Sequence, residues 1–157
     1  MPTTYADYIG RTVDVAAFDG AKPTGKALLA QVLARPGQGG KIVTGIQKLV
    51  QRFLIELFTE AGTVPYHPDR GTMFLTEIRS GELRTHLDVL GAFARAVSTI
   101  QRTFAAEDKA TDPPDERLES VTLDSISFEP GTLRLYATLT SRAGASRPLI
   151  LPIALVL

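Results

Sequence analysis

The sequence predicts an α+β fold in which two main helices pack on a small sheet with a C-terminal three-stranded meander, preceded by an extended N-terminal arm. Two central segments repeat apolar residues at three- and four-residue intervals, and the period changes to two after residue 116. Before residue 45, glycine and proline interrupt every short apolar stretch. We therefore expect an arm, residues 1–44, and a domain, residues 45–157.

The first predicted helix runs from Thr44 to Gly62. Thr44 followed by Gln47 fits a capping box at its start, and Gly62 is suited to a left-handed turn at its end. Its apolar residues form one stripe that we expect to be core: Ile46, Leu49, Val50, Phe53, Leu54, Leu57 and Phe58.

A second helix is predicted from Leu83 or Thr85 to Phe104. Between the two helices, residues 63–71 hold two prolines and a glycine, which predicts a turn-rich loop, and the aromatic Tyr66 favours an ordered one. The apolar stripe of the second helix comprises Leu87, Leu90, Phe93 or Ala94, Val97, Ile100 and Phe104.

Three strands should follow, at Leu118–Phe128, Leu133–Thr140 and Pro148–Leu157. A Pro-Gly turn joins the first two, and the segment Ala143–Ala145 joins the last two. The prolines at 148 and 152 cannot donate ladder hydrogen bonds, which predicts that the final strand lies at an edge, or that these two positions face away from a neighbouring strand. Both faces of that strand are apolar, so we expect another chain to cover one of them: Leu149, Leu151, Ile153 and Leu155 lie on one face, and Ile150, Ala154 and Val156 on the other.

The arm is the least regular part of the chain. Residues 12–18 alternate weakly and are suited to a strand, and residues 26–34 to about two helical turns. An arm that needs a partner surface and a disordered leader both fit this composition.

Composition excludes several function classes. Seventeen basic and seventeen acidic residues cancel, so we expect neither a nucleic-acid nor a membrane partner. With no cysteine and only His67 and His86, we expect no metal, no cofactor and no catalytic residue. The longest apolar run, residues 149–157, is half of the ~20 residues that a spanning helix needs, and no signal peptide is visible, so we expect a soluble protein.

The segment from Gln47 to Leu75 resembles the signature of the sheath-initiator proteins, which sit in the baseplate wedge of contractile phage tails and related injection machines. In that family a helix runs into a Thr-x-x-Gly turn, a proline-containing loop, a Gly-Ser/Thr step and an apolar residue. The matching positions here are Thr59, Gly62, Pro65, Pro68, Gly71, Thr72 and Leu75. The resemblance covers roughly residues 45–157.

The resemblance implies a structural role. The family's Glu-Pro-Arg docking step is similar to Pro114–Leu118, which implies wedge-binding residues Arg117, Glu116 and Asp115. The family's sheet templates the first sheath ring by strand addition. Here the final strand would take that role through Leu149, Ile150, Leu151, Ile153 and Leu155.

The expected partners are therefore baseplate wedge proteins and the tail sheath protein, with tube or hub proteins as candidates for the arm. The expected location is the tail baseplate of the virion, assembled in the host cytoplasm.

Two alternatives stay open: a lysozyme-like, tail-associated peptidoglycan hydrolase, and a tail completion or terminator protein. A hydrolase needs two carboxyl groups across a cleft, one with a raised pKa. Glu56 and Glu60 are four residues apart, but we place them on the solvated face of the first helix, and we interpret His67 as a loop residue. Asp69 and Arg70 are expected to form a local ion pair or to contact a partner. An assembly protein, not an enzyme, is the favoured interpretation.

Overall fold

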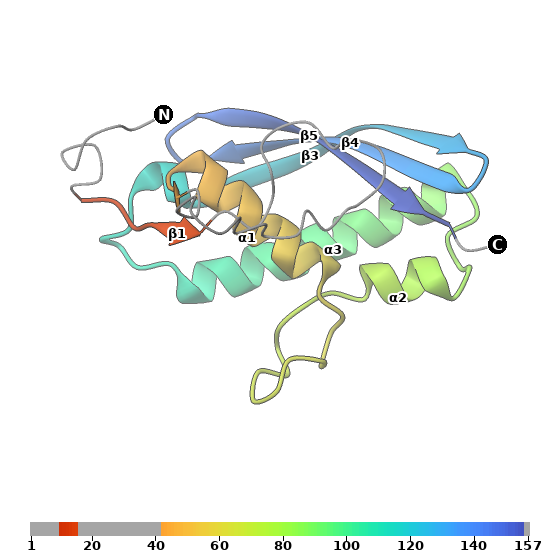
Figure 1. Ribbon diagram of the computed structural model, residues 1–157, viewed down its shortest axis with the longest axis horizontal. Coiled ribbons are helices and arrows are strands. Elements are labelled where there is room, and N and C mark those ends of the chain that lie inside the picture. The colour runs from red at the N-terminus through yellow and green to blue at the C-terminus, as the bar shows by residue number, and fades with distance from the viewer. Residues whose placement is uncertain (1–9, 16–41, 156–157) are drawn as a thin grey trace, which may run out of the picture.

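A computed structural model describes residues 10–15 and 42–155 of the chain (Figure 1). The element order confirms the predicted α+β class, with two main helices followed by an antiparallel meander. The elements are β1 (Asp14–Val15), β2 (Ile42–Val43), α1 (Ile46–Phe58), α2 (Phe74–Arg79), α3 (His86–Glu107), the 3-10 turn η2 (Pro114–Glu116), β3 (Leu118–Glu129), β4 (Thr132–Ser141) and β5 (Ser146–Ala154).

The meander has the order β3-β4-β5, so β4 is central and β5 is an edge strand, as predicted. Helix α3 contacts β3, and α1 contacts β4 and β5. All three helices lie on one side of the sheet (Figure 1). The core forms between these layers and includes Leu49, Phe53, Leu57, Phe74, Phe93, Ile100, Phe104, Leu133, Leu135 and Leu139.

Helix α1 is shorter than the sequence predicted, and the expected capping box at Thr44 is wrong. The cap residue is Gly45, with a φ of 61°, and no side chain of that residue can cap the helix. The Thr44 hydroxyl instead donates to the carbonyl of Thr12 (3.0 Å) and to Glu116. Gly62 does adopt a positive φ of 76°, but in the loop beyond the helix end at Phe58.

Helix α3 begins with a capping box that the sequence analysis did not single out. The Thr85 hydroxyl accepts from the N–H of Asp88 (3.2 Å), and the Asp88 carboxylate accepts from the N–H of Thr85 (2.8 Å). The predicted core positions Leu87 and Leu90 are exposed. Alanines on the neighbouring helix face let α1 and α2 approach there, and the buried stripe is Val89, Ala92, Phe93, Ala96, Val97, Ile100 and Phe104.

The described parts of the predicted arm belong to the folded body. Strands β1 and β2 pair antiparallel, with Asp14 opposite Val43. Gln51 of α1 donates to Asp14 (3.0 Å), which ties the pair to the helix. The strand expected over residues 12–18 is described only to Val15, and the helical turns expected at 26–34 lie outside the described residues.

Candidate docking surfaces

Glu116 is buried at the start of α1, although the resemblance implied a partner contact there. Its side chain accepts from the Thr44 hydroxyl (3.1 Å), from the N–H of Gly45 (3.3 Å) and from the ammonium of Lys48 (3.3 Å). The Thr12 hydroxyl donates to the same carboxylate. An anion is stabilised at a helix N-terminus by the free N–H groups and the helix dipole. Glu116 therefore supplies the cap that Thr44 does not.

Asp115 is also engaged within the chain. The guanidinium of Arg11 donates to its carboxylate, and this hydrogen bond, together with the charge of Asp115, raises the pKa of Arg11 above its ordinary value. The two acids thus fasten the N-terminal segment to η2.

Arg117, unlike these two acids, has a side-chain group without a hydrogen-bond partner in the described part of the chain. Among the buried side-chain nitrogen and oxygen atoms of the described residues, its Nε is the one without a hydrogen-bond partner. The backbone around it is fixed, because the N–H of Arg142 donates to its carbonyl (2.9 Å) and the N–H of Ala143 donates to that of Pro114 (3.2 Å). An unsatisfied buried N–H is costly, and this Nε is shielded from solvent although the residue as a whole is half-buried.

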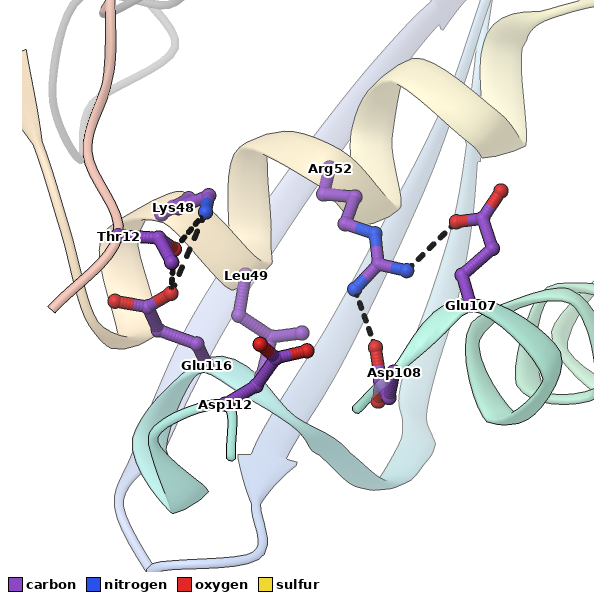
Figure 2. A pocket seen from close by; sticks show the side chains of 8 residues that line it. All are labelled: Thr12, Lys48, Leu49, Arg52, Glu107, Asp108, Asp112 and Glu116. Carbon is purple, nitrogen blue, oxygen red and sulfur yellow. Dashed lines mark hydrogen bonds and ion pairs between the residues drawn. The ribbon is translucent and has the colours of Figure 1, made fainter. Parts of the chain in front are cut away.

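A pocket of about 290 Å³ lies beside this step, between α1 and the end of α3 (Figure 2). Arg52 points from α1 to Glu107 and Asp108, with nitrogen–oxygen distances of 2.7 Å to each. Burial lowers the pKa of Arg52, but the hydrogen bonds that it donates to these two acids, together with their negative charges, outweigh burial and raise the pKa above its ordinary value. The guanidinium also stacks on the ring of Phe104, 3.9 Å from its centroid.

Each carboxylate in the pocket wall is already used by the chain itself. Glu107 and Asp108 bind Arg52, Glu116 caps α1, and Asp112 accepts from the N–H of Lys109 (2.7 Å). No group of three or more acids and histidines among the described residues is arranged to hold a metal ion. The pocket is therefore a junction of internal ion pairs.

Strand β5 uses most of the side chains that the sequence analysis assigned to a partner. Leu149, Leu151 and Ile153 are buried in the chain's own core, and Leu155 is half-buried against it. Ile150 points the other way and is exposed. Of the five residues, Ile150 is the one whose side chain remains open.

The hydrogen-bond ladder shows which way each β5 N–H points. The N–H of Leu155 donates to the carbonyl of Gly131 (2.9 Å). Because bonded and non-bonded pairs alternate along an antiparallel ladder, odd-numbered β5 residues bond to β4 and even-numbered ones face the open edge. Pro148 and Pro152 occupy that edge and have no N–H. Between them Ile150 keeps the one outward donor, so the prolines blunt this edge.

The other edge, β3, has no proline. The same alternation leaves the N–H groups of Ile126 and Phe128 facing away from β4. Register shifts at Glu119 and Asp124 interrupt the first half of the strand. The segment 125–129 is regular, so it is better suited than β5 to pair with an added strand.

Exposed apolar side chains flank this part of β3. The ring of Phe128 lies edge-on to that of His86, with centroids 5.0 Å apart. Leu90 follows His86 by four residues on α3 and so neighbours it on the helix surface, and Leu87 is three residues from Leu90. All four residues are exposed, which gives an apolar surface beside the open edge.

The loop between α1 and α2 carries the residues that resemble the family signature. Thr59 follows the end of α1, and Gly62, Pro65 and Pro68 lie exposed along the loop. Gly71 closes it with a φ of 86°, and a Cβ there would lie 2.5 Å from the carbonyl oxygen of Thr59. Only glycine fits this position without a backbone shift.

The expectation that Glu56 is solvated is wrong. It is buried, and its carboxylate accepts from the N–H of Gly71 (2.8 Å) and from Arg70 (3.0 Å). The returning loop covers a helix face that looked polar in the sequence. Arg70 also pairs with Glu107 (3.0 Å), so it is directed inward and not toward Asp69. His67 is exposed in the loop, as predicted.

Comparisons with protein-family models, with curated proteins and with solved structures found no match for this chain. No helix of the described residues is long and apolar enough to span a membrane.

Sequence reasoning missed two structural contacts at these surfaces. Thr12 and Lys48 meet at Glu116, although they are far apart in the sequence and no local pattern links them. The spacing of Pro148 and Pro152 did carry a signal, since residues four apart on a strand face the same edge. The spacing therefore indicated not only that the strand lies at an edge but also that this edge lacks donors for a further strand.

Proposed function

We propose that this chain is a structural component of a contractile-tail baseplate, which docks on the wedge and templates the first sheath ring by strand addition. It would act in the virion tail after assembly in the host cytoplasm. Support comes from the signature-like loop, which folds as an ordered connection between two helices, and from the meander that follows.

The observation that carries the proposal is the open edge of β3. Outward N–H and C=O groups at Ile126 and Phe128 offer the directional hydrogen bonds that an incoming strand requires. The apolar surface of His86, Leu87, Leu90 and Phe128 lies beside them. Strand addition therefore uses β3, and the proline-blunted β5 edge stays unpaired.

Wedge docking is the role of Arg117 in this proposal. Arg117 is only half-buried and its backbone is fixed, and a guanidinium binds a carboxylate with two parallel hydrogen bonds, which suits a carboxylate from a neighbouring subunit. Asp115 and Glu116 act inside the chain and orient the step.

A pair of substitutions at Phe128 tests strand addition. Phe128→Pro removes the outward N–H and the ring, whereas Phe128→Ala removes only the ring. Neither substitution removes a hydrogen bond between β3 and β4, since the N–H of Phe128 faces away from β4. In tails assembled with each variant, Phe128→Pro should lower the fraction that carries sheath at least tenfold relative to Phe128→Ala. Equal sheath recruitment by two folded variants would exclude this edge.

A further inference from the structure

Tyr66 lies at the tip of the α1–α2 loop and is the most exposed large apolar residue of the described chain. Its relative exposure is 98%, and neither hydrogen bonds nor ring contacts within the described residues involve its side chain. It is also the one described residue other than glycine with a positive φ, 65°. Tyrosine is disfavoured in that conformation.

The loop below the tip is braced. At its base the N–H of Thr72 donates to the carbonyl of Thr59 (2.8 Å), and the Thr72 hydroxyl donates to that of Leu57 (2.9 Å). Nearer the tip, the N–H of His67 donates to the carbonyl of Val64 (3.1 Å). The loop extends away from the helices (Figure 1). Local hydrogen bonds thus hold an unfavourable backbone that presents an aromatic ring to solvent.

We propose that Tyr66 is an anchor side chain that inserts into an apolar pocket on a neighbouring protein subunit. Strained residues held by their surroundings occur at functional sites, and tyrosine is enriched among the residues that dominate binding energy at protein interfaces. A rigid tip loses little conformational entropy on binding.

The chemistry of the tip favours a protein pocket. Pro65 and Pro68 stand on either side of Tyr66 in the sequence and are exposed, so they add rigid apolar surface to the tip, and the phenolic O–H needs one acceptor at the pocket's end. A membrane surface would require a wider apolar face with basic residues, whereas Asp69 is the charged group next to this tip. A sugar would require a concave site, and this one is convex.

Three substitutions at Tyr66 separate binding from folding. Asparagine tolerates a positive φ, so Tyr66→Asn should leave the free energy of unfolding unchanged or higher. The same variant, like Tyr66→Ala, should lower incorporation into the particle at least tenfold, while Tyr66→Phe keeps most of it. Met73→Ala, at the exposed foot of the same loop, is the control and should incorporate normally.

The contact itself is tested by photocrosslinking. p-Benzoylphenylalanine replaces Tyr66 in cells that produce the full chain, with the same group at Met73 as control. We expect a crosslink from position 66 to one pocket of another protein subunit. Normal incorporation of Tyr66→Asn, a destabilised Tyr66→Asn, or crosslinking only to lipid or cell-wall sugar would overturn the inference. This inference rests on the proposed function only for the identity of the assembly. A crosslink to a subunit that belongs to no tail would contradict the baseplate role but would still support Tyr66 as an anchor side chain.

Discussion

Within the step from Asp115 to Arg117, neighbouring charges have different tasks. The two acids are bound by Arg11, Thr12 and Lys48, so their removal would loosen the N-terminal segment. The Nε of Arg117 has no such partner among the described residues. A sequence pattern of acids followed by arginine does not distinguish these states, because the distinction depends on residues about 70 to 100 positions away.

Arg117→Ala should weaken incorporation into the wedge while the monomer stays folded. A buried interfacial charge left without its partner typically costs about 2 to 5 kcal/mol. The measurement is the amount of each variant in purified baseplates, with circular dichroism to check folding. Arg102→Ala is the matched control, since Arg102 is exposed and, among the described residues, its hydrogen bond goes to Thr99 on its own helix. Equal incorporation of both variants would remove Arg117 from the docking surface.

Glu56→Gln should destabilise the fold by about 1.5 to 3 kcal/mol, because the buried carboxylate holds charge-assisted hydrogen bonds to Gly71 and Arg70. Urea-induced unfolding measures the effect. Glu60→Gln is the control: its ion pair with Arg79 is largely exposed and is worth less than about 1 kcal/mol. A smaller loss for Glu56→Gln than for Glu60→Gln would contradict the loop-anchoring role.

At the scale of elements, the start of α3 depends on a titratable cap. Hydrogen bonds from Thr85, and a weaker contribution from the backbone of Arg84, lower the pKa of Asp88 below its ordinary value of 3.8. A group whose pKa is lower in the folded state stabilises the fold above its unfolded pKa. That contribution is lost as the pH falls through the folded value.

Below pH 3.8, wild-type stability should therefore fall more steeply than that of Asp88→Asn, whose cap does not titrate. Free energies of unfolding from pH 6 down to pH 2 provide the comparison. Asp69→Asn, in the exposed loop, controls for the loss of one acid. Parallel curves for wild type and Asp88→Asn would show that the cap contributes no pH dependence.

The prolines of β5 lie on the sheet edge opposite β3, and replacing them tests whether they protect that edge. Replacing both Pro148 and Pro152 with threonine restores two outward N–H groups without touching the ladder to β4. The double variant should self-associate at least tenfold more tightly than wild type in sedimentation velocity. Pro65→Thr, in the loop, should not change self-association. A monomeric double variant would mean that the prolines do not protect this edge.

The elements that could be predicted from the sequence are those whose apolar pattern repeats over many residues. Elements without such a repeat were missed. The alternation in β4 and the stripe of α1 each bury one face, so pattern and packing agree. Helix α2 has six residues, fewer than two turns, and shows no repeat. In α3, small alanines allowed close packing on the face beside the predicted stripe. Burial of Glu56 arises from a returning loop, which periodicity does not describe.

In the molecule as a whole, the three surfaces belong to different elements. The η2 step with Arg117 contacts the start of α1, residues 125–129 belong to the free edge strand β3, and the loop with Tyr66 follows the other end of α1 (Figure 1). A subunit with separate contact regions suits an assembly in which it meets several neighbours at once. The zero net charge agrees with contacts based on local complementarity and not on a long-range field.

Cryo-electron microscopy of an intact particle that contains this chain would show its neighbours directly. We expect the chain in the baseplate, with Arg117 against a carboxylate of a wedge subunit and a sheath strand paired with residues 125–129 of β3. A map that places the chain at the opposite end of the tail, or that shows the β3 edge unpaired beside a fully assembled sheath ring, would contradict it.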